Sequence, residues 1–239
     1  MNRIALVAAV TATLAAATAA NATTQLVTNG DFTNLTSGLG QLGFNTTAVG
    51  WSTTGYNFVM TQADVGSVGS FGKVTLWDAA NGGSNSWNGL TLSGTGNFAA
   101  LNGDFHTGPL TQTITGLTVG DKYHLSFNYA FSQQNGFTGD TSQSLTETLG
   151  GQTFNSGSVS LPSHGFSGWQ TFSTTITASS SSETLSFLAA GTPQVPPFAL
   201  VSNVSLTVPE PAAWSLLILG VGLVGGSLRR RRADIALTA

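Results

Sequence analysis

The sequence lacks cysteine and has little charge, and these two absences exclude several classes of protein. None of its 239 residues is cysteine, which excludes a disulfide scaffold, a zinc–thiolate site and a cysteine nucleophile. Charged residues make up only 7% of the chain, and residues 23–207 carry two lysines, no arginine and eight acids, a net charge of −6. Nucleic acids and acidic lipids are bound by clustered lysines and arginines, so this part of the chain has no surface suited to either.

Helical periodicity is also missing from residues 23–207, whereas the alternation typical of strands is clear. In residues 123–131, aromatic and leucine side chains alternate with polar or small ones, as in a strand with one buried face. Residues 118–121 predict a turn before this strand, and residues 110–117 are its predicted partner. The aromatics and the alternation together favour a folded domain over a disordered one.

Glycine-rich turns separate further short strands. Gly150-Gly151, between 145–149 and 152–154, predicts a two-residue hairpin, since glycine permits positive φ at both turn positions. Trp51 and Trp169 each follow a glycine at a strand start and are expected in the core. Other strands are expected at 169–177, 184–189 and 199–206. Many short strands with glycine turns predict an all-β fold, a sandwich or a barrel, for residues 23–207.

The first 22 residues have the three parts of a secretory signal peptide. Arg3 supplies the positive charge, residues 4–20 the apolar core, and Ala20-Asn21-Ala22 the cleavage site. The mature protein is therefore expected to begin near Thr23 and to be exported.

A second apolar run, residues 212–228, lies near the C-terminus and predicts a single transmembrane helix. Its 17 residues contain no charge, and as a helix they reach about 25 Å, near the lower limit for crossing a bilayer core. The arginines at 229–232 anchor the cytoplasmic end, and residues 233–239 form a cytoplasmic tail. A buried core helix is disfavoured because the run is apolar all round, and a plain tail anchor is disfavoured by the signal peptide.

The order of parts in this tail resembles a known sorting signal. Pro209-Glu210-Pro211, Trp214, the apolar run and the arginines Arg229, Arg230, Arg231 and Arg232 are similar to the PEP-CTERM signal, here residues 208–232. The Pro-Glu-Pro-x-x-Trp spacing resembles its PEPxxWA-CTERM subclass, with Ser215 in place of the usual alanine. The resemblance implies export by a Gram-negative, polysaccharide-producing bacterium and recognition by exosortase, a protease of the inner membrane.

Several segments of residues 23–207 resemble galactose-binding-like domains, which implies a jelly-roll β-sandwich. The resemblance lies in residues 29–32, 50–51, 100–103, 112–127, 166–169, 185–190 and 196–206. The closing strand of such domains often carries an aspartate that binds a structural calcium ion, and Ser202 stands there in this chain. No cofactor is therefore predicted, because a calcium ion would have no clear ligand set.

Candidate catalytic residues are few. Glycoside hydrolysis needs two carboxylates about 5 to 9.5 Å apart, and Asp78 and Asp104 fit that pairing best. Four of the eight acids, Asp31, Asp104, Asp121 and Asp140, follow glycine in turn-like contexts typical of Asx turns. Asp104 and His106 could share a strand face as a metal pair, although an exposed pair at a loop edge is favoured.

A sugar-binding surface is better supported by the residue types. Sugars stack on flat aromatic faces and bond to amides and carboxylates. Trp77, Asp78, Asn85, Trp87 and Asp104 are the candidate ligand-binding residues. The alternatives are that Trp77 ends a strand and packs, and that Trp87 fastens a long loop.

Two functions remain open. The first is a non-enzymatic surface or matrix protein that binds exopolysaccharide or forms part of the envelope; a purely structural adhesin without a ligand is a third possibility beside these two. The second is a secreted, glycan-active hydrolase of low activity. In both, the tail anchors the chain transiently in the inner membrane before it reaches the cell surface.

Overall fold

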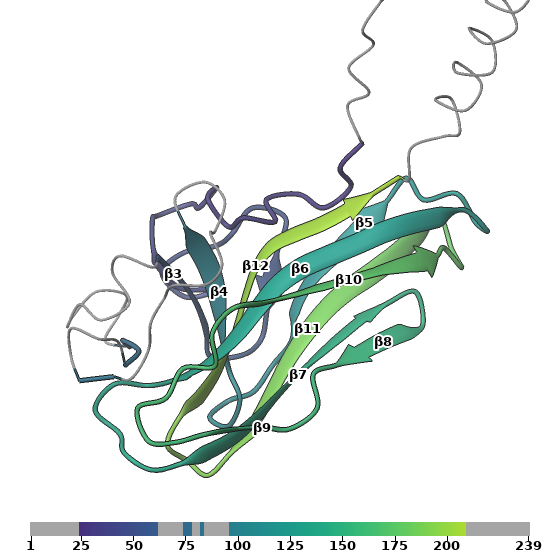
Figure 1. Ribbon diagram of the computed structural model, residues 1–239. Coiled ribbons are helices and arrows are strands. Elements are labelled where there is room, and N and C mark those ends of the chain that lie inside the picture. Colours follow the sequence, from purple (N-terminus) through teal and green to yellow (C-terminus); the bar gives the residue numbers. More distant parts are fainter. Residues whose placement is uncertain (1–23, 62–73, 78–81, 84–95, 209–239) are drawn as a thin grey trace, which may run out of the picture.

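The chain folds as two antiparallel β-sheets packed face to face in the computed structural model, which describes residues 24–61, 74–77, 82–83 and 96–208 (Figure 1). The first sheet has the order β1-β3-β4-β12-β6-β10, and the second β2-β5-β11-β7-β8 with β9 also on β7. In the first sheet the bounds are β1 Gly40–Gln41, β3 Asn57–Thr61, β4 Asn97–Asn102, β6 Lys122–Gln133, β10 Gln170–Thr177 and β12 Pro197–Thr207. In the second they are β2 Ser52–Thr53, β5 Leu110–Thr115, β7 Thr141–Leu149, β8 Gln152–Asn155, β9 Val159–Leu161 and β11 Ser182–Thr192.

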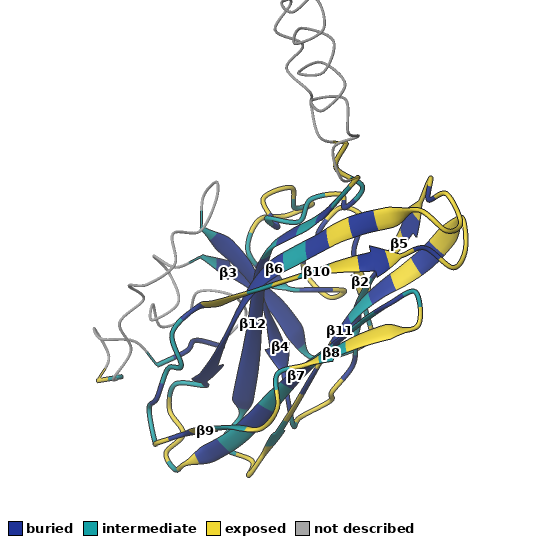
Figure 2. Ribbon diagram, turned by 45° about the vertical axis from the view of Figure 1, so that its right-hand side comes forward, coloured by how far each residue is buried: buried dark blue, intermediate teal, exposed yellow. Residues whose placement is uncertain are grey.

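Alternating side chains build the half-buried strands as the sequence predicts. On β6, Tyr123, Leu125 and Phe127 are buried, whereas Lys122 and His124 are exposed. The same banding of buried and exposed residues runs along β5 and β11 (Figure 2), and β10 alternates exposed with half-buried residues. The all-β prediction for residues 23–207 is therefore confirmed for the described part of the chain as two packed sheets.

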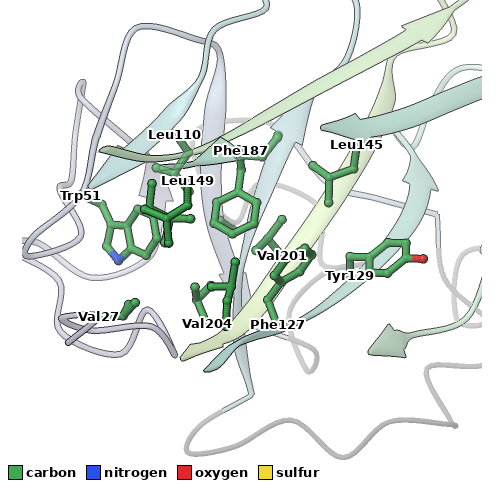
Figure 3. Packing of buried hydrophobic residues seen from close by; sticks show 14 of the residues in the cluster. Val27, Trp51, Leu110, Phe127, Tyr129, Leu145, Leu149, Phe187, Val201 and Val204 are labelled. Carbon is green, nitrogen blue, oxygen red and sulfur yellow. The ribbon is translucent and has the colours of Figure 1, made fainter. Parts of the chain in front are cut away.

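The main core lies between the sheets and is rich in aromatic rings (Figure 3). The ring centroid of Phe187 on β11 lies 5.0 Å from that of Phe127 on β6, edge to face, and 6.1 Å from that of Trp51. Fully burying one such side chain contributes about 1.5–3 kcal/mol. Trp51 and Trp169 are 5% and 7% exposed, so their predicted burial is confirmed.

A second, smaller core covers the outer face of the first sheet. Phe58, Phe98 and Phe198 point away from the main core and are fully buried. They pack under residues 74–77, whose Val74 and Leu76 belong to the same cluster, and under Trp169. Strands β3 and β4 and the first half of β12 are consequently buried on both faces.

One strand pairing differs from the prediction. Residues 110–115 form β5, which pairs with β2 and β11 in the second sheet, whereas residues 123–131 pair with β10 and β12 in the first. The predicted pairing of 110–117 with 123–131 is therefore wrong. The turn at 118–121 carries the chain from one sheet to the other, because both strands need a buried face on the same core.

The glycine hairpin is confirmed. Gly150 and Gly151 have φ of 60° and 77°, and Leu149 pairs with Gln152 across them. Both backbones lie in the left-handed region that glycine adopts without steric cost.

The two ends of the described chain meet at one end of the sandwich (Figure 1). Gln25 forms a bridge with Thr207, the last residue of β12. The opposite end is built by the start of β3, the ends of β4 and β6, and the start of β12, since Asn102 pairs with Phe198 and Gln133 with Pro197.

Several predictions fall on parts of the chain outside the described residues. They are the signal peptide 1–22, the sorting residues 209–211 and Trp214, the helix 212–228, the arginines 229–232, the tail 233–239, and Asp78, Asn85 and Trp87. Within the residues that the structure does describe, no helix has the length and apolar character needed to cross a membrane.

Candidate functional site

A cleft of about 300 Å³ opens at the end of the sandwich opposite Thr207. It is lined by three aromatic side chains, four polar ones and a proline: Tyr56, Phe105, Phe137, Asn102, Asp104, Gln134, Gln194 and Pro196. They come from the residue before β3, the turn after β4, the loop after β6 and the turn before β12. Four segments far apart in the sequence therefore meet at one site.

The turn after β4 is organised by the Asn102 side chain. Its Oδ1 accepts hydrogen bonds from the backbone N–H of Asp104 at 3.0 Å and of Phe105 at 2.7 Å. Its own backbone N–H donates to Oδ1 of Asn57, and Tyr56 N–H donates to the carbonyl of His106. This Asx turn fixes the backbone that carries Asp104 and Phe105 into the cleft.

Asn102 also holds a buried donor without a described partner. The residue is 1% exposed, and its Nδ2 donates no hydrogen bond to any described residue. Leaving a buried donor without a partner costs about 1–3 kcal/mol. This cost is part of holding the turn through Oδ1, because Nδ2 itself is buried below the cleft surface.

Exposed aromatic rings face the same cleft. Phe105 is 53% and Phe137 43% exposed, although large apolar side chains are usually buried. Tyr56 supports Phe105 edge to face, with ring centroids 5.4 Å apart, and itself packs edge to face on Phe58 at 4.7 Å. The aromatic wall is therefore anchored in the second core.

Residues 74–77 brace the loop that carries Phe137. Trp77 Nε1–H donates to the carbonyl of Phe137 at 2.9 Å, and Asn135 N–H donates to the carbonyl of Thr75 at 2.8 Å. One face of the Trp77 indole stacks on His164, with ring centroids 3.8 Å apart. Trp77 thus packs behind the cleft wall and does not line the cleft.

The buried side chain of Gln133 holds the same loop through hydrogen bonds. Gln133 Nε2 donates to Oγ1 of Thr141 at 2.8 Å and to the carbonyl of Gly139 at 3.2 Å, and its Oε1 accepts from His164 N–H at 2.6 Å. Gln133 is fully buried. This network fixes the base of the loop 134–140 and the segment around His164.

Of the predicted ligand-binding residues, the structure brings Asp104 into the cleft and Trp77 against its wall. Asp78, Asn85 and Trp87 stay predictions outside the described residues. Sequence reasoning missed Asn102, Phe105 and Phe137. An asparagine followed by Gly103 and Asp104 is typical of an Asx turn, so Asn102 had a local signal. The cleft itself depends on contacts between distant segments.

Asp104 and His106 do not share a strand face but lie at a loop edge, the alternative that the sequence favoured. Strand β4 ends at Asn102, and His106 lies in the following turn with φ of 46°. Its ring lies perpendicular to that of Phe105. Within the described residues no group of three or more histidines and acids is placed to hold a metal ion. Ser202, at the position discussed for calcium, is buried and donates to the carbonyl of Asn97 at 2.7 Å.

The remaining acids have structural surroundings. Asp31 forms the expected Asx turn, since its Oδ1 accepts from Thr33 N–H at 3.3 Å. Asp140 instead accepts from Ser163 N–H across two loops, at 2.9 Å. Glu147 lies between the sheets, 3% exposed, and this burial raises its pKa to about 7. None of these three acids lines the cleft.

The structure defines the class first: an all-β sandwich with an aromatic and amide-lined cleft at one end. The end of the chain then adds the sorting function, because residues 207–232 match the PEP-CTERM protein-sorting motif. The chain thus carries the tail of an exported protein destined for the cell surface or the extracellular space. No curated protein matches the sequence.

The solved structures to which the chain is similar include carbohydrate-binding domains of low sequence identity. TmCBM61, solved with β-1,4-galactotriose, is 12% identical, with 78% of this chain and 99% of that chain covered and a TM-score of 0.43. The xylan-binding CBM22-1 of Paenibacillus barcinonensis Xyn10C is 11% identical, with coverages of 81% and 100% and a TM-score of 0.36. The N-terminal cellulose-binding domain of Cellulomonas fimi β-1,4-glucanase C is 12% identical, with coverages of 68% and 90% and a TM-score of 0.33.

Proposed function

We propose that this protein is a non-enzymatic cell-surface or matrix protein that binds extracellular polysaccharide through the cleft. The observation that carries the proposal is the meeting of exposed Phe105 and Phe137 with the amides of Gln134 and Gln194 and the carboxylate of Asp104. Sugar rings present C–H faces that stack on aromatics and hydroxyls that need both donors and acceptors. The cleft offers all three kinds of contact.

The site is held by the fold before a ligand arrives. The Asx turn of Asn102 fixes one wall, and Trp77 and Gln133 fix the loop of the other. A preorganised site spends less free energy on ordering its own side chains when it binds.

The position of the cleft agrees with sorting through the tail. The sorting motif begins at the end of β12, where Thr207 pairs with Gln25, and the cleft lies at the opposite end of the same strand. A sandwich attached at one end presents the other end to the surroundings. We infer that a signal peptide of residues 1–22 exports the chain, that helix 212–228 holds it transiently in the inner membrane, and that an exosortase-type protease releases it.

The strand order supports a jelly-roll topology within the sandwich. Consecutive strands β4, β5, β6 and β7 alternate between the two sheets, and β10, β11 and β12 do the same. We assign the galactose-binding-like jelly roll on this alternation, which also explains why loops from both sheets gather at the cleft.

A polysaccharide pull-down with the full-length chain tests the function. The chain is kept in a detergent without a sugar headgroup, so that the detergent does not compete for the cleft. Phe105→Ala and Phe137→Ala are each expected to weaken retention roughly three- to tenfold, from the lost stacking. Phe44→Ala is the matched control, since Phe44 is 82% exposed and lies outside the cleft.

Unchanged retention in both cleft variants would contradict the proposal. Assaying the same mixtures for new reducing ends separates binding from hydrolysis. Release of product that is lost in Asp104→Asn would show the alternative activity, a glycan hydrolase.

A further inference from the structure

The described residues around the cleft carry a negative charge without a positive charge to offset it, and this affects which glycans the cleft can bind. Among the described lining residues, Asp104 is the one charged side chain, and the other polar ones are the amides of Asn102, Gln134 and Gln194. Among the described residues the single lysine is Lys122, which begins β6 at the opposite end of the sandwich. Nothing in the described part of the chain offsets the carboxylate of Asp104.

Amide donors and a carboxylate acceptor meet in the cleft. The side-chain amides of Gln134 and Gln194 line it together with Asp104, and each amide carries an NH₂ group that can donate to a ligand. An ionised carboxylate offers only acceptors. Sugar hydroxyls satisfy both kinds of group, one accepting from an amide and another donating to the carboxylate.

We propose, building on the glycan-binding function above, that the cleft selects neutral sugars and rejects uronic acids and other anionic glycans. A sugar carboxylate would have no hydrogen to donate to Asp104 and would bring a second negative charge beside it, without a described lysine or arginine to offset the repulsion. The net charge of −6 on residues 23–207 repels polyanions further. The volume of about 300 Å³ is at the lower end of ligand sites, about 300–1,000 Å³, so the unit recognised is short.

Matched glycans test this selectivity. The full-length chain, in a detergent without a sugar headgroup, is titrated against a panel of neutral polysaccharides and against the same polymers oxidised at C6 to uronic acids. At low salt, the neutral polymers are expected to bind at least about tenfold more tightly than their oxidised counterparts. At 1 M salt, where the Debye length falls to about 3 Å, the difference is expected to shrink.

Two variants assign the selectivity to Asp104. Asp104→Asn is expected to weaken binding of the neutral member about tenfold through the lost charge-assisted hydrogen bond, while binding of its oxidised counterpart rises. Asp121→Asn removes the same charge from an exposed turn at the other end of the sandwich and is expected to leave the neutral-to-acidic ratio unchanged. Asp104 is partly exposed and makes no side-chain hydrogen bond to a described residue, so the fold does not depend on it.

The outcomes distinguish a failure of the proposed selectivity from a failure of the proposed glycan binding. If oxidised polymers bind as tightly as neutral ones, or if Asp104→Asn leaves the ratio unchanged, the selectivity is overturned while glycan binding stands. If no member of either series is retained, glycan binding is overturned, and the selectivity with it.

Discussion

Glu147 is a single residue whose burial links the stability of the sandwich to pH. It occupies an inward-facing position of β7, next to a cavity of about 60 Å³ lined partly by Phe154, Phe172 and Ile176. Its Oε1 accepts no hydrogen bond from a described residue. Removal from water raises its pKa from 4.5 to about 7, because an ionised carboxylate loses its hydration there.

Glu147→Gln is therefore expected to change the pH dependence of stability. Between pH 4.5 and 7 the folded state keeps a proton that the unfolded state releases, so the free energy of unfolding falls as pH rises and then levels off above pH 7. The loss amounts to at most about 3 kcal/mol. Glutamine removes the titration. The free energy of unfolding of the variant, relative to that of the wild type, should therefore be higher at pH 8 than at pH 5.

Urea unfolding at several pH values between 4 and 8.5 measures this effect on the full-length chain. Asp121→Asn, which removes an exposed acid, is the control and should keep the wild-type slope. A Glu147→Gln curve parallel to that of the wild type would contradict the role given to the buried carboxyl.

The surroundings of a residue can be predicted from the sequence where the local pattern decides them. Trp51 and Trp169 were assigned to the core from their position after glycine, and Asp31 to an Asx turn from its neighbours. The cleft residues Phe105 and Phe137 give no such signal, because a phenylalanine in a loop is normally buried. Their exposure is set by Tyr56 and by the bracing of the loop 134–140, which are tertiary contacts.

Among the elements, the hairpin between β7 and β8 shows how two adjacent glycines can have different tasks. A Cβ at Gly151 would meet no atom within 4 Å. A Cβ at Gly150 would overlap the carboxylate of Glu183, whose Oε1 is fixed by the backbone N–H groups of Ser179 and Ser180. Gly150 is thus needed for both its φ and its lack of a side chain.

Gly151→Ala is expected to cost about 1 kcal/mol of unfolding free energy, from backbone strain alone. Gly150→Ala is expected to cost at least about 2 kcal/mol, since the overlap with Glu183 adds to the same strain. Denaturant unfolding of the two variants gives the comparison. Equal losses would show that the Glu183 carboxylate moves away freely and that only φ matters at this turn.

Strands differed in how far they could be predicted. Those with one buried face, such as β6, β10 and β11, are recognisable from alternation alone. Strands β3 and β4 are buried on both faces by the second core, so their side chains show no period of two. The pairing of β5 was mispredicted because a short turn is equally compatible with a hairpin and with a crossing between sheets.

On the scale of the whole molecule, the sorting motif and the proposed recognition site lie at opposite ends of the fold. Strand β12 connects them, with its start beside the cleft and its end at the sorting motif. Among the described residues, the last member of either core cluster is Leu206. We expect the sandwich to keep its cleft without the tail.

The tail can be tested by mass spectrometry of the protein at the cell surface. The released form is expected to lack the apolar run and the arginines, with its new end near Pro209-Glu210-Pro211. Replacing these three residues by alanine should leave the chain intact to Ala239 and in the membrane fraction, because the extended segment that a protease binds is lost. Thr238→Ala, beyond the arginines, serves as the control and should be processed normally. Recovery of released wild-type protein that still ends at Ala239 would contradict processing, whereas a shortened form that binds polysaccharide as well as the full chain would show that the tail serves delivery alone.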